Sequence, residues 1–252
     1  MIRRTALALI FALPAVWAAD DALPKAEAIL DRYVEVTGGK AAYEKRKTEV
    51  VTGTMAFPAQ GLKGTMTRYG AEPNQSYVTI ELEGIGKLES GTSGGISWDK
   101  NPIMGARVKS GEEKAQASRE SRFNEPIHWR ELYSKAETVA VEAVDGDDCY
   151  KVVMTPTEGK PETQYFSKKT GLIVKSVLTA VSPMGEIQAE GFSSDYKEFG
   201  GVKVPTKIVQ KAAGQEFIVT IETVKINESL PSDRFEPPTE IKALLNKAAE
   251  KK

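Results

Sequence analysis

The sequence has little of the side-chain chemistry that enzymes and metal proteins use. It contains one cysteine and one histidine among 252 residues. The single cysteine, Cys149, excludes an internal disulfide, and the single histidine, His128, excludes a metal site built from several histidines. No neighbouring base would activate Cys149, so we expect a half-buried structural thiol. We expect His128, next to Trp129, to be a packing or surface residue.

The sequence also lacks an excess of charge of either sign. It has 34 Lys and Arg against 35 Asp and Glu, which gives a formal net charge of −1. Proteins that bind nucleic acids by their phosphates need clustered positive charge. The balance therefore argues against a nucleic-acid partner.

Long apolar runs are missing beyond the N-terminus, and the one near the start is short. Met1–Arg4 is positively charged, Ala6–Val16 is apolar, and small residues surround Trp17. This pattern predicts a secretory signal peptide over residues 1–18, cleaved after Ala18. A membrane anchor is the alternative, but about 18 apolar residues would be needed to span a bilayer. No cysteine near the cut could carry a lipid, so we expect a soluble periplasmic protein.

What the sequence does have is a series of strand patterns separated by turns. Between Gly- and Pro-containing turns, β-branched and aromatic residues alternate with polar ones, as Phe217, Val219 and Ile221 do. Successive short turns predict an antiparallel meander. The predicted strands cover 47–57, 62–69, 75–83, 85–90, 94–98, 137–144, 148–155, 162–167, 171–180, 185–195, 202–210 and 215–226.

Helical patterns lie before the strands and between two groups of them. Ala22–Val36 has an amphipathic period, with Asp20 or Asp21 as its predicted cap. Residues 40–46 suit a short second helix. Segment 100–135 is predicted to begin irregularly and then form helices at Gly111–Phe123 and Pro126–Tyr133. Insertions of this size into a sheet are typically lids or partner sites.

These elements predict a mainly β (α+β) fold of one domain over 19–238. We expect an unclosed β-barrel of about 11–12 strands, because a long twisted meander curls instead of lying flat. The N-terminal helix and the helical insertion would cover it. Residues 239–252 read as a polar tail, with a frayed helix at 240–251.

Three short motifs resemble functional sites, and each has a plainer interpretation. The segment around Ser93 matches G-x-S-x-G, and Asp99 and His128 follow in the order of a catalytic triad. That motif requires a helix after the serine, whereas the sequence predicts another strand. The acidic turn at 145–148 lacks the spacing of a calcium loop, and the glycines at 84–86 lack the third glycine of a dinucleotide loop. We therefore predict no catalytic residue, no metal and no cofactor.

Apolar and soft side chains are spread over the strands and the insertion. If the curled sheet is partly hollow, some of them would line a lipid site, where methionine adapts to irregular chains. Each buried methylene contributes about 0.8 kcal/mol, so one long acyl chain could gain roughly 10 kcal/mol before the costs of binding. The predicted lining residues are Met55, Phe57, Met66, Ile80, Leu82, Trp98, Met104, Trp129, Leu172, Val174, Phe217 and Val219.

Several segments of the sequence resemble the LolA/LolB superfamily of bacterial lipoprotein carriers, especially proteins called outer-membrane lipoprotein-sorting proteins. The resemblance lies in the strand-turn-strand run 165–173, in 194–205 with its Gly200-Gly201 turn, and in Asn227 followed by 235–238. It implies a half-barrel with a helical lid whose cavity holds acyl chains in the periplasm. Because no lipidated cysteine is present, the chain is similar to the soluble LolA type.

The resemblance therefore implies a monomeric carrier or chaperone for lipids or acylated lipoproteins. It would exchange its ligand with membrane-associated donor and acceptor proteins. The sequence leaves two alternatives open. One is an exported interaction or sensor module with a filled core, and the other is a hydrolase that uses Ser93.

Overall fold

A computed structural model describes residues 22–183 and 185–250. The predicted signal peptide, residues 1–18, lies outside them. In the described part of the chain, thirteen strands form one sheet. In chain order they are β1 Thr48–Phe57, β2 Leu62–Ala71, β3 Gln75–Leu82, β4 Gly86–Ser93, β5 Ile96–Asn101, β6 Gly105–Val108, β7 Tyr133–Val144, β8 Asp147–Pro156, β9 Glu162–Ser167, β10 Ile173–Ser182, β11 Gly185–Phe199, β12 Val202–Ala212 and β13 Gln215–Ile226.

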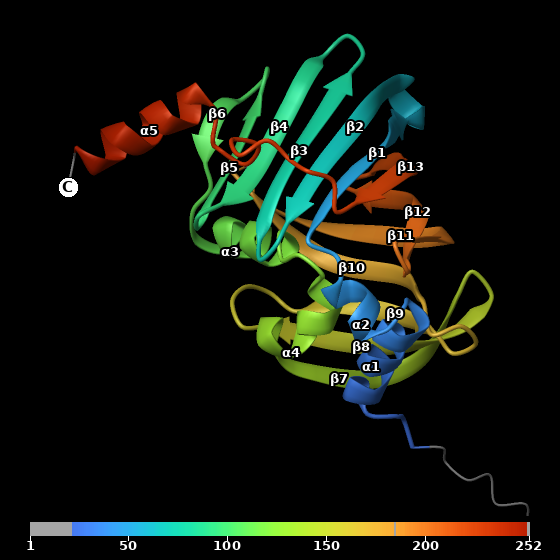
Figure 1. The fold of residues 1–252 in the computed structure, drawn as a ribbon. Helices are drawn as coiled ribbons and strands as arrows, with labels where there is room; N and C mark the ends of the chain where they lie inside the picture. The colour runs from blue at the N-terminus through green and yellow to red at the C-terminus, as the bar shows by residue number, and fades with distance from the viewer. Residues whose placement is uncertain (1–21, 184, 251–252) are drawn as a thin grey trace, which may run out of the picture.

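The sheet is an unclosed half-barrel, as the sequence predicted. Its strand order is β6-β5-β4-β3-β2-β1-β13-β12-β11-β10-β9-β8-β7, and neighbouring strands are antiparallel. Strands β6 and β7 are the two edges, although they follow one another in the chain. The segment that joins them therefore passes from one edge of the sheet to the other across its open side (Figure 1).

The predicted count of 11–12 strands was one or two too low. Segment 100–107, predicted to be irregular, contains the first three residues of strand β6, which pairs with β5 from Trp98↔Val108 to Asn101↔Gly105. The signal was hidden because Pro102 breaks the pattern and the strand has only four residues.

Five α-helices and two 3-10 turns complete the described elements. Their bounds are α1 Ala26–Val36, α2 Lys40–Glu44, η1 Pro58–Gln60, α3 Gly111–Glu120, η2 Glu125–His128, α4 Trp129–Leu132 and α5 Thr239–Ala249. No helix in the described residues is both long and apolar enough to cross a bilayer.

Helix α1 begins four residues later than predicted. Residue 25 is its N-cap and offers no side-chain hydrogen bond, while Asp20 and Asp21 lie outside the described residues. The reason is Pro24, since a proline disfavours helical geometry at the residue before it.

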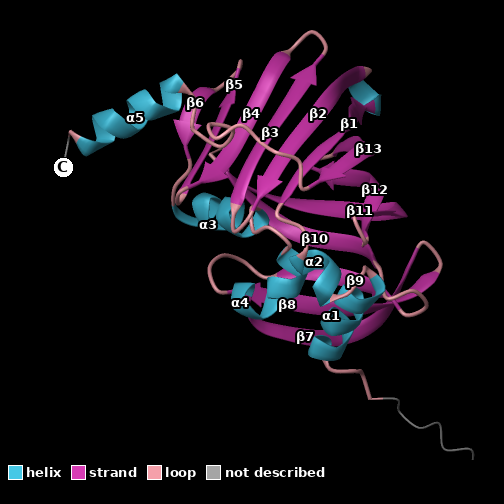
Figure 2. Ribbon diagram, in the orientation of Figure 1, coloured by secondary structure: helices cyan, strands magenta, loops and turns pink. Residues whose placement is uncertain are grey.

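The main apolar core lies between α1, α4 and strands β7–β9. Ile29 and Leu30 of α1 pack with Trp129 of α4 and with Val152 and Phe166 of the sheet. All five side chains are at most 8% exposed. Figure 2 shows α1, α2 and α4 lying over the strands at this end of the sheet.

Helix α3 spans the open side and is attached to both walls. Near its start, Arg107 of β6 donates to Glu113 at 2.7 Å and also bonds Asp99 of β5. On the other wall, the Val181 amide of β10 donates to Gln116 at 3.1 Å. These attachments make α3 a lid over the middle of the half-barrel.

The C-terminal segment packs on the face of the sheet opposite to the helices. Arg234 stacks on the ring of Tyr69 at 4.4 Å, and Lys100 pairs with Glu240 at 2.7 Å. Ile241 of α5 is fully buried. Figure 1 shows this segment crossing β2–β4 before α5 extends beyond the β6 edge.

Candidate ligand-binding cavity

Strand register shows which side chains share the helix-covered face, because residues directly opposite each other on paired strands point the same way. Ile208 lies under α3 in a cleft of the half-barrel. Its partner on β13 is Val219, whose partner on β1 is Met55. The same pairing continues through Gly64 on β2 to Leu82 on β3. These residues therefore all face the inside of the half-barrel.

Seven of the twelve predicted lining residues lie together on this inner face, on the four adjacent strands β13, β1, β2 and β3. We call them the apolar strip. Its members are Met55, Phe57, Met66, Ile80, Leu82, Phe217 and Val219. The rings of Phe57 and Phe217 lie 5.4 Å apart.

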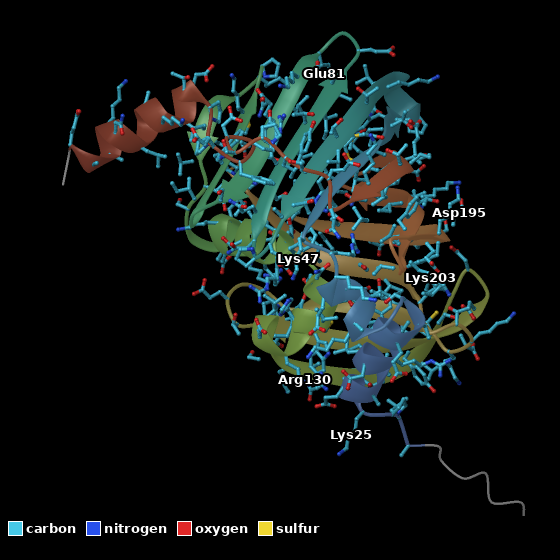
Figure 3. The ribbon with its side chains drawn as sticks, in the orientation of Figure 1. Lys25, Lys47, Glu81, Arg130, Asp195 and Lys203 are labelled. Carbon is cyan, nitrogen blue, oxygen red and sulfur yellow. The ribbon has the colours of Figure 1, made fainter. Side chains whose placement is uncertain are left out.

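The apolar strip is only partly buried. Met55, Leu82 and Val219 are each 8% exposed, whereas the other four side chains are half-buried. The covering helices contact β5, β7 and β10 instead. In Figure 3, Glu81 marks the end of β3 next to the strip, and Arg130 marks the distant end that the helices cover. The half-barrel thus has a helix-covered end and an apolar, more open end.

The other five predicted residues lie elsewhere. Trp98 is 1% exposed, but it faces the opposite side of the sheet, where its ring lies over Gly91 and 6.0 Å from the ring of Tyr77. Trp129 belongs to the core under α1.

Met104 lies in the β5–β6 turn and is 43% exposed. Leu172 is half-buried in the turn before β10, and Val174 sits where the β9–β10 register shifts. None of these five side chains therefore extends the apolar strip.

A cleft of about 520 Å³ separates α3 from strands β10–β12. Its floor combines the apolar Leu178, Ala180, Ala189 and Ile208 with the polar Ser176, Ser193 and Gln210, and α3 contributes polar side chains above it. Ile208 is the cross-strand partner of Val219, so the cleft floor continues directly into the apolar strip. Together they form one surface that changes from polar to apolar along the half-barrel.

The sequence analysis missed the cleft residues. Leu178 and Ile208 do alternate with outward-facing neighbours, and that period is visible in the sequence. Their face becomes known only from the pairing of β10 with β11 and of β12 with β13.

Acidic groups are concentrated at the covered end of the half-barrel. Glu162 accepts hydrogen bonds from Arg119 at 3.1 Å and from Tyr133 at 2.6 Å. Glu125, which faces this pair, is half-buried, and its loss of hydration together with the charge of Glu162 raises its carboxyl pKa to about 7.

Glu120, the last residue of α3, projects into the cleft. It remains accessible within the cleft, yet protein surrounds it, and this loss of hydration raises its carboxyl pKa. The covered end is therefore polar and rich in acids.

The structure gives the three triad-like residues separate partners. Ser93 ends β4 and accepts from Gln75 at 3.2 Å, Asp99 bonds Arg107, and His128 lies 3.1 Å from Glu131. Strand β5 follows the serine, so the strand-turn-helix of a nucleophile elbow is not formed.

Neither the acidic turn nor the cysteine forms a reactive site. Asp145 and Gly146 form the β7–β8 turn, both with positive φ. The described residues contain no cluster of three or more His, Cys, Asp or Glu side chains that could hold a metal ion. Cys149 is fully buried, and burial raises the pKa of its thiol.

Comparisons with known proteins show the fold. No family model matches the chain, and no curated protein matches it in sequence. Among solved structures, a DUF1329 family protein from Desulfovibrio piger matches with a TM-score of 0.58 and 16% identity, over 85% of this chain and 98% of that one.

Two further structures give the same result. A LolA superfamily protein from Nitrosomonas europaea matches with a TM-score of 0.58 and 15% identity, over 85% of this chain and 99% of that one. A domain described as an outer membrane lipoprotein-sorting protein, from Vibrio parahaemolyticus, has a TM-score of 0.53 and 13% identity, over 84% of this chain and 97% of that one. At such identities the likeness establishes a shared architecture.

Proposed function

From the LolA/LolB-like fold of this chain, we propose that it is an exported, non-catalytic carrier of lipids or acylated lipoproteins. The observation that carries the proposal is the apolar strip. It crosses four adjacent strands, a width of about 14 Å at about 4.8 Å per strand spacing. Four of its side chains stay accessible on a face that a filled barrel would bury.

The energy of such binding would come from apolar contact alone. Twelve methylenes placed against the strip and the cleft floor would contribute about 10 kcal/mol before the entropic cost of association. This gain needs no reactive group. The filled-core alternative has less support, because the strip ends in a cleft of about 520 Å³.

The predicted signal peptide at residues 1–18 supports a periplasmic location for the carrier. A monomer would then exchange its ligand with membrane-associated donor and acceptor proteins.

Two substitutions at neighbouring positions of β3, one on each face of the sheet, test the proposal. Ile80 belongs to the apolar strip, and its neighbour Thr79 faces the opposite side of the sheet. We expect Ile80→Asn to weaken the uptake of a fluorescent fatty acid about tenfold, because a buried amide without a partner costs about 1–3 kcal/mol. Thr79→Asn should leave uptake unchanged.

The measurement is a fluorescence titration of the folded protein residues 19–252. If the wild-type protein ignored the probe, or if both variants bound it as well as the wild type does, the carrier proposal would be wrong.

A further inference from the structure

A smaller pocket of about 170 Å³ adjoins the cleft beneath the end of α3. It lies between α3 and strands β2–β5. The two cavities share Lys109, Ala117 and Glu120, so they meet at these residues. An apolar chain in the cleft would therefore end next to this pocket.

The pocket presents two cations. Arg46 and Arg68 both donate to Glu49, so two guanidinium groups face one carboxylate and one positive charge is left over. The Arg46 side chain is 6% exposed and that of Arg68 is 31% exposed, and it is Arg68 that lines the pocket. The second cation is Lys109, whose Nζ forms a long ion pair of 3.9 Å with Asp99.

Hydroxyl groups line the strand side of the same pocket. Ser76, Ser90 and Thr92 lie on the neighbouring strands β3 and β4. The Thr92 hydroxyl already donates to Ser97 at 3.0 Å, so the hydroxyl donors offered to a ligand are those of Ser76 and Ser90. Guanidinium, ammonium and hydroxyl donors in one small cavity are the groups that bind phosphate oxygens. A hydrocarbon chain has no acceptor atoms and could not form hydrogen bonds with these donors.

At the boundary of the two cavities stands an acid. Glu120 accepts a hydrogen bond from Gln116 at 3.0 Å, and no ion pair to it is found among the described residues. The neighbouring Arg119 is committed to Glu162. Glu120 is also the last residue of α3, where free carbonyl groups add negative potential. Both conditions favour a cationic ligand group beside it.

We propose that this pocket is a headgroup site for a zwitterionic phospholipid of the phosphoethanolamine type. Arg68 and Lys109 bind its phosphate, Glu120 accepts hydrogen bonds from its ammonium group, and its acyl chains follow the cleft floor to the apolar strip. This assignment rests on the proposed carrier function. A phosphoglycerol headgroup would satisfy the two cations but offer no ammonium group to Glu120.

The test compares lipids that differ only in their headgroups. Native mass spectrometry would measure binding of dioleoyl phosphatidylethanolamine, phosphatidylglycerol and phosphatidylcholine, and of oleic acid, to the folded protein. We expect about tenfold tighter binding of the ethanolamine lipid than of the other two phospholipids, since a hydrogen bond to a charged group contributes about 1.5–3 kcal/mol.

Two variants and one control test the roles of Glu120 and Lys109 in binding the headgroup. Glu120→Gln should reduce the preference to less than about twofold, and Lys109→Gln should weaken all three phospholipids about tenfold while oleic acid binds as before. Glu112→Gln, on an exposed residue in the first turn of α3, should match the wild type.

The possible failures are distinguishable. Equal binding of the three phospholipids, with oleic acid still bound, would overturn the headgroup site and leave the carrier function intact. If no lipid bound, oleic acid included, the carrier function itself would fail. Displacement of the lipid by micromolar inorganic phosphate would identify a free-phosphate site and overturn the assignment to a lipid.

Discussion

At the scale of single residues, the covered end of the half-barrel places carboxyl groups where they are poorly hydrated. Glu125 has the largest consequence, because its pKa of about 7 is well above the ordinary 4.5. The groups that face it are Glu162, which raises the pKa, and Arg119, which lowers it. Tyr133 donates to Glu162 in the same cluster.

The sign of the pH dependence follows from these values. Between pH 4.5 and 7 the folded protein holds a proton on Glu125 that the unfolded chain has lost. The stability linked to this group is therefore complete below pH 4.5 and is lost as the pH rises through 7.

We expect Glu125→Gln to remove this dependence. The variant should raise the free energy of unfolding by about 2 kcal/mol at pH 8 and change it little at pH 4. Urea unfolding at both pH values would measure the difference, with Glu112→Gln as the exposed control. If the substitution changed the free energy of unfolding equally at both pH values, ionisation of Glu125 would not destabilise the folded protein, and its pKa would not be raised.

The sequence shows which side chains of a strand share a face, but it does not show whether that face is the inner or the outer face of the half-barrel. Alternation correctly groups Phe217 with Val219 on one side of β13. It gives no information about Trp98, because a buried tryptophan suits either side of a sheet. Only the register with Gly91 and Tyr77 places its ring on the face opposite to the helices.

At the scale of elements, α3 decides whether the cleft is open or closed. Its contacts with the far wall are few and polar. Gln116 accepts from the Val181 amide, and Arg119 pairs with Glu162. Helix α3 has no fully buried residue, so little apolar burial holds it in place.

A single substitution should therefore loosen the lid. Gln116→Ala removes the acceptor for the Val181 amide, which costs about 1 kcal/mol for one neutral hydrogen bond. We expect release of a bound fatty acid to become about fivefold faster. Amide hydrogen exchange should also rise across α3.

Lys114→Ala is the matched control, because Lys114 is exposed on the same helix. Unchanged release and unchanged exchange in Gln116→Ala would show that α3 is not the element that gates the cleft.

Elements with long periodic patterns could be predicted well, and short ones could not. The predicted strands 162–167 and 215–226 agree with β9 and β13 residue for residue. Strand β6 was missed because a four-residue strand after Pro102 is held by pairing with β5, not by its own pattern.

At the scale of the whole molecule, the meander and its unclosed curl follow from the sequence, since each turn joins neighbouring strands. The position of the cavity cannot be derived from the sequence in this way. It depends on the pairing of β13 with β1, which brings residues about 170 positions apart into register. Arg68, Lys109 and Glu120 meet in one pocket for the same reason, and no local pattern connects them.

The topology also explains how one chain can combine two environments. Because α3 crosses from the β6 edge to the β10 wall, it encloses polar groups in the middle of the half-barrel and leaves the apolar strip beyond it less covered. A molecule that is polar at one end and apolar at the other would match this division. A fully polar or fully apolar ligand would leave one part unmatched.

The most direct test is mass spectrometry of an organic extract from the purified protein, expressed from the full sequence 1–252 and isolated without detergent. We predict that the extract contains long-chain lipid at a molar ratio near one to the protein, and that Ile80→Asn reduces this amount while Thr79→Asn does not. A wild-type protein recovered free of lipid would contradict the claim that the half-barrel is a container for acyl chains.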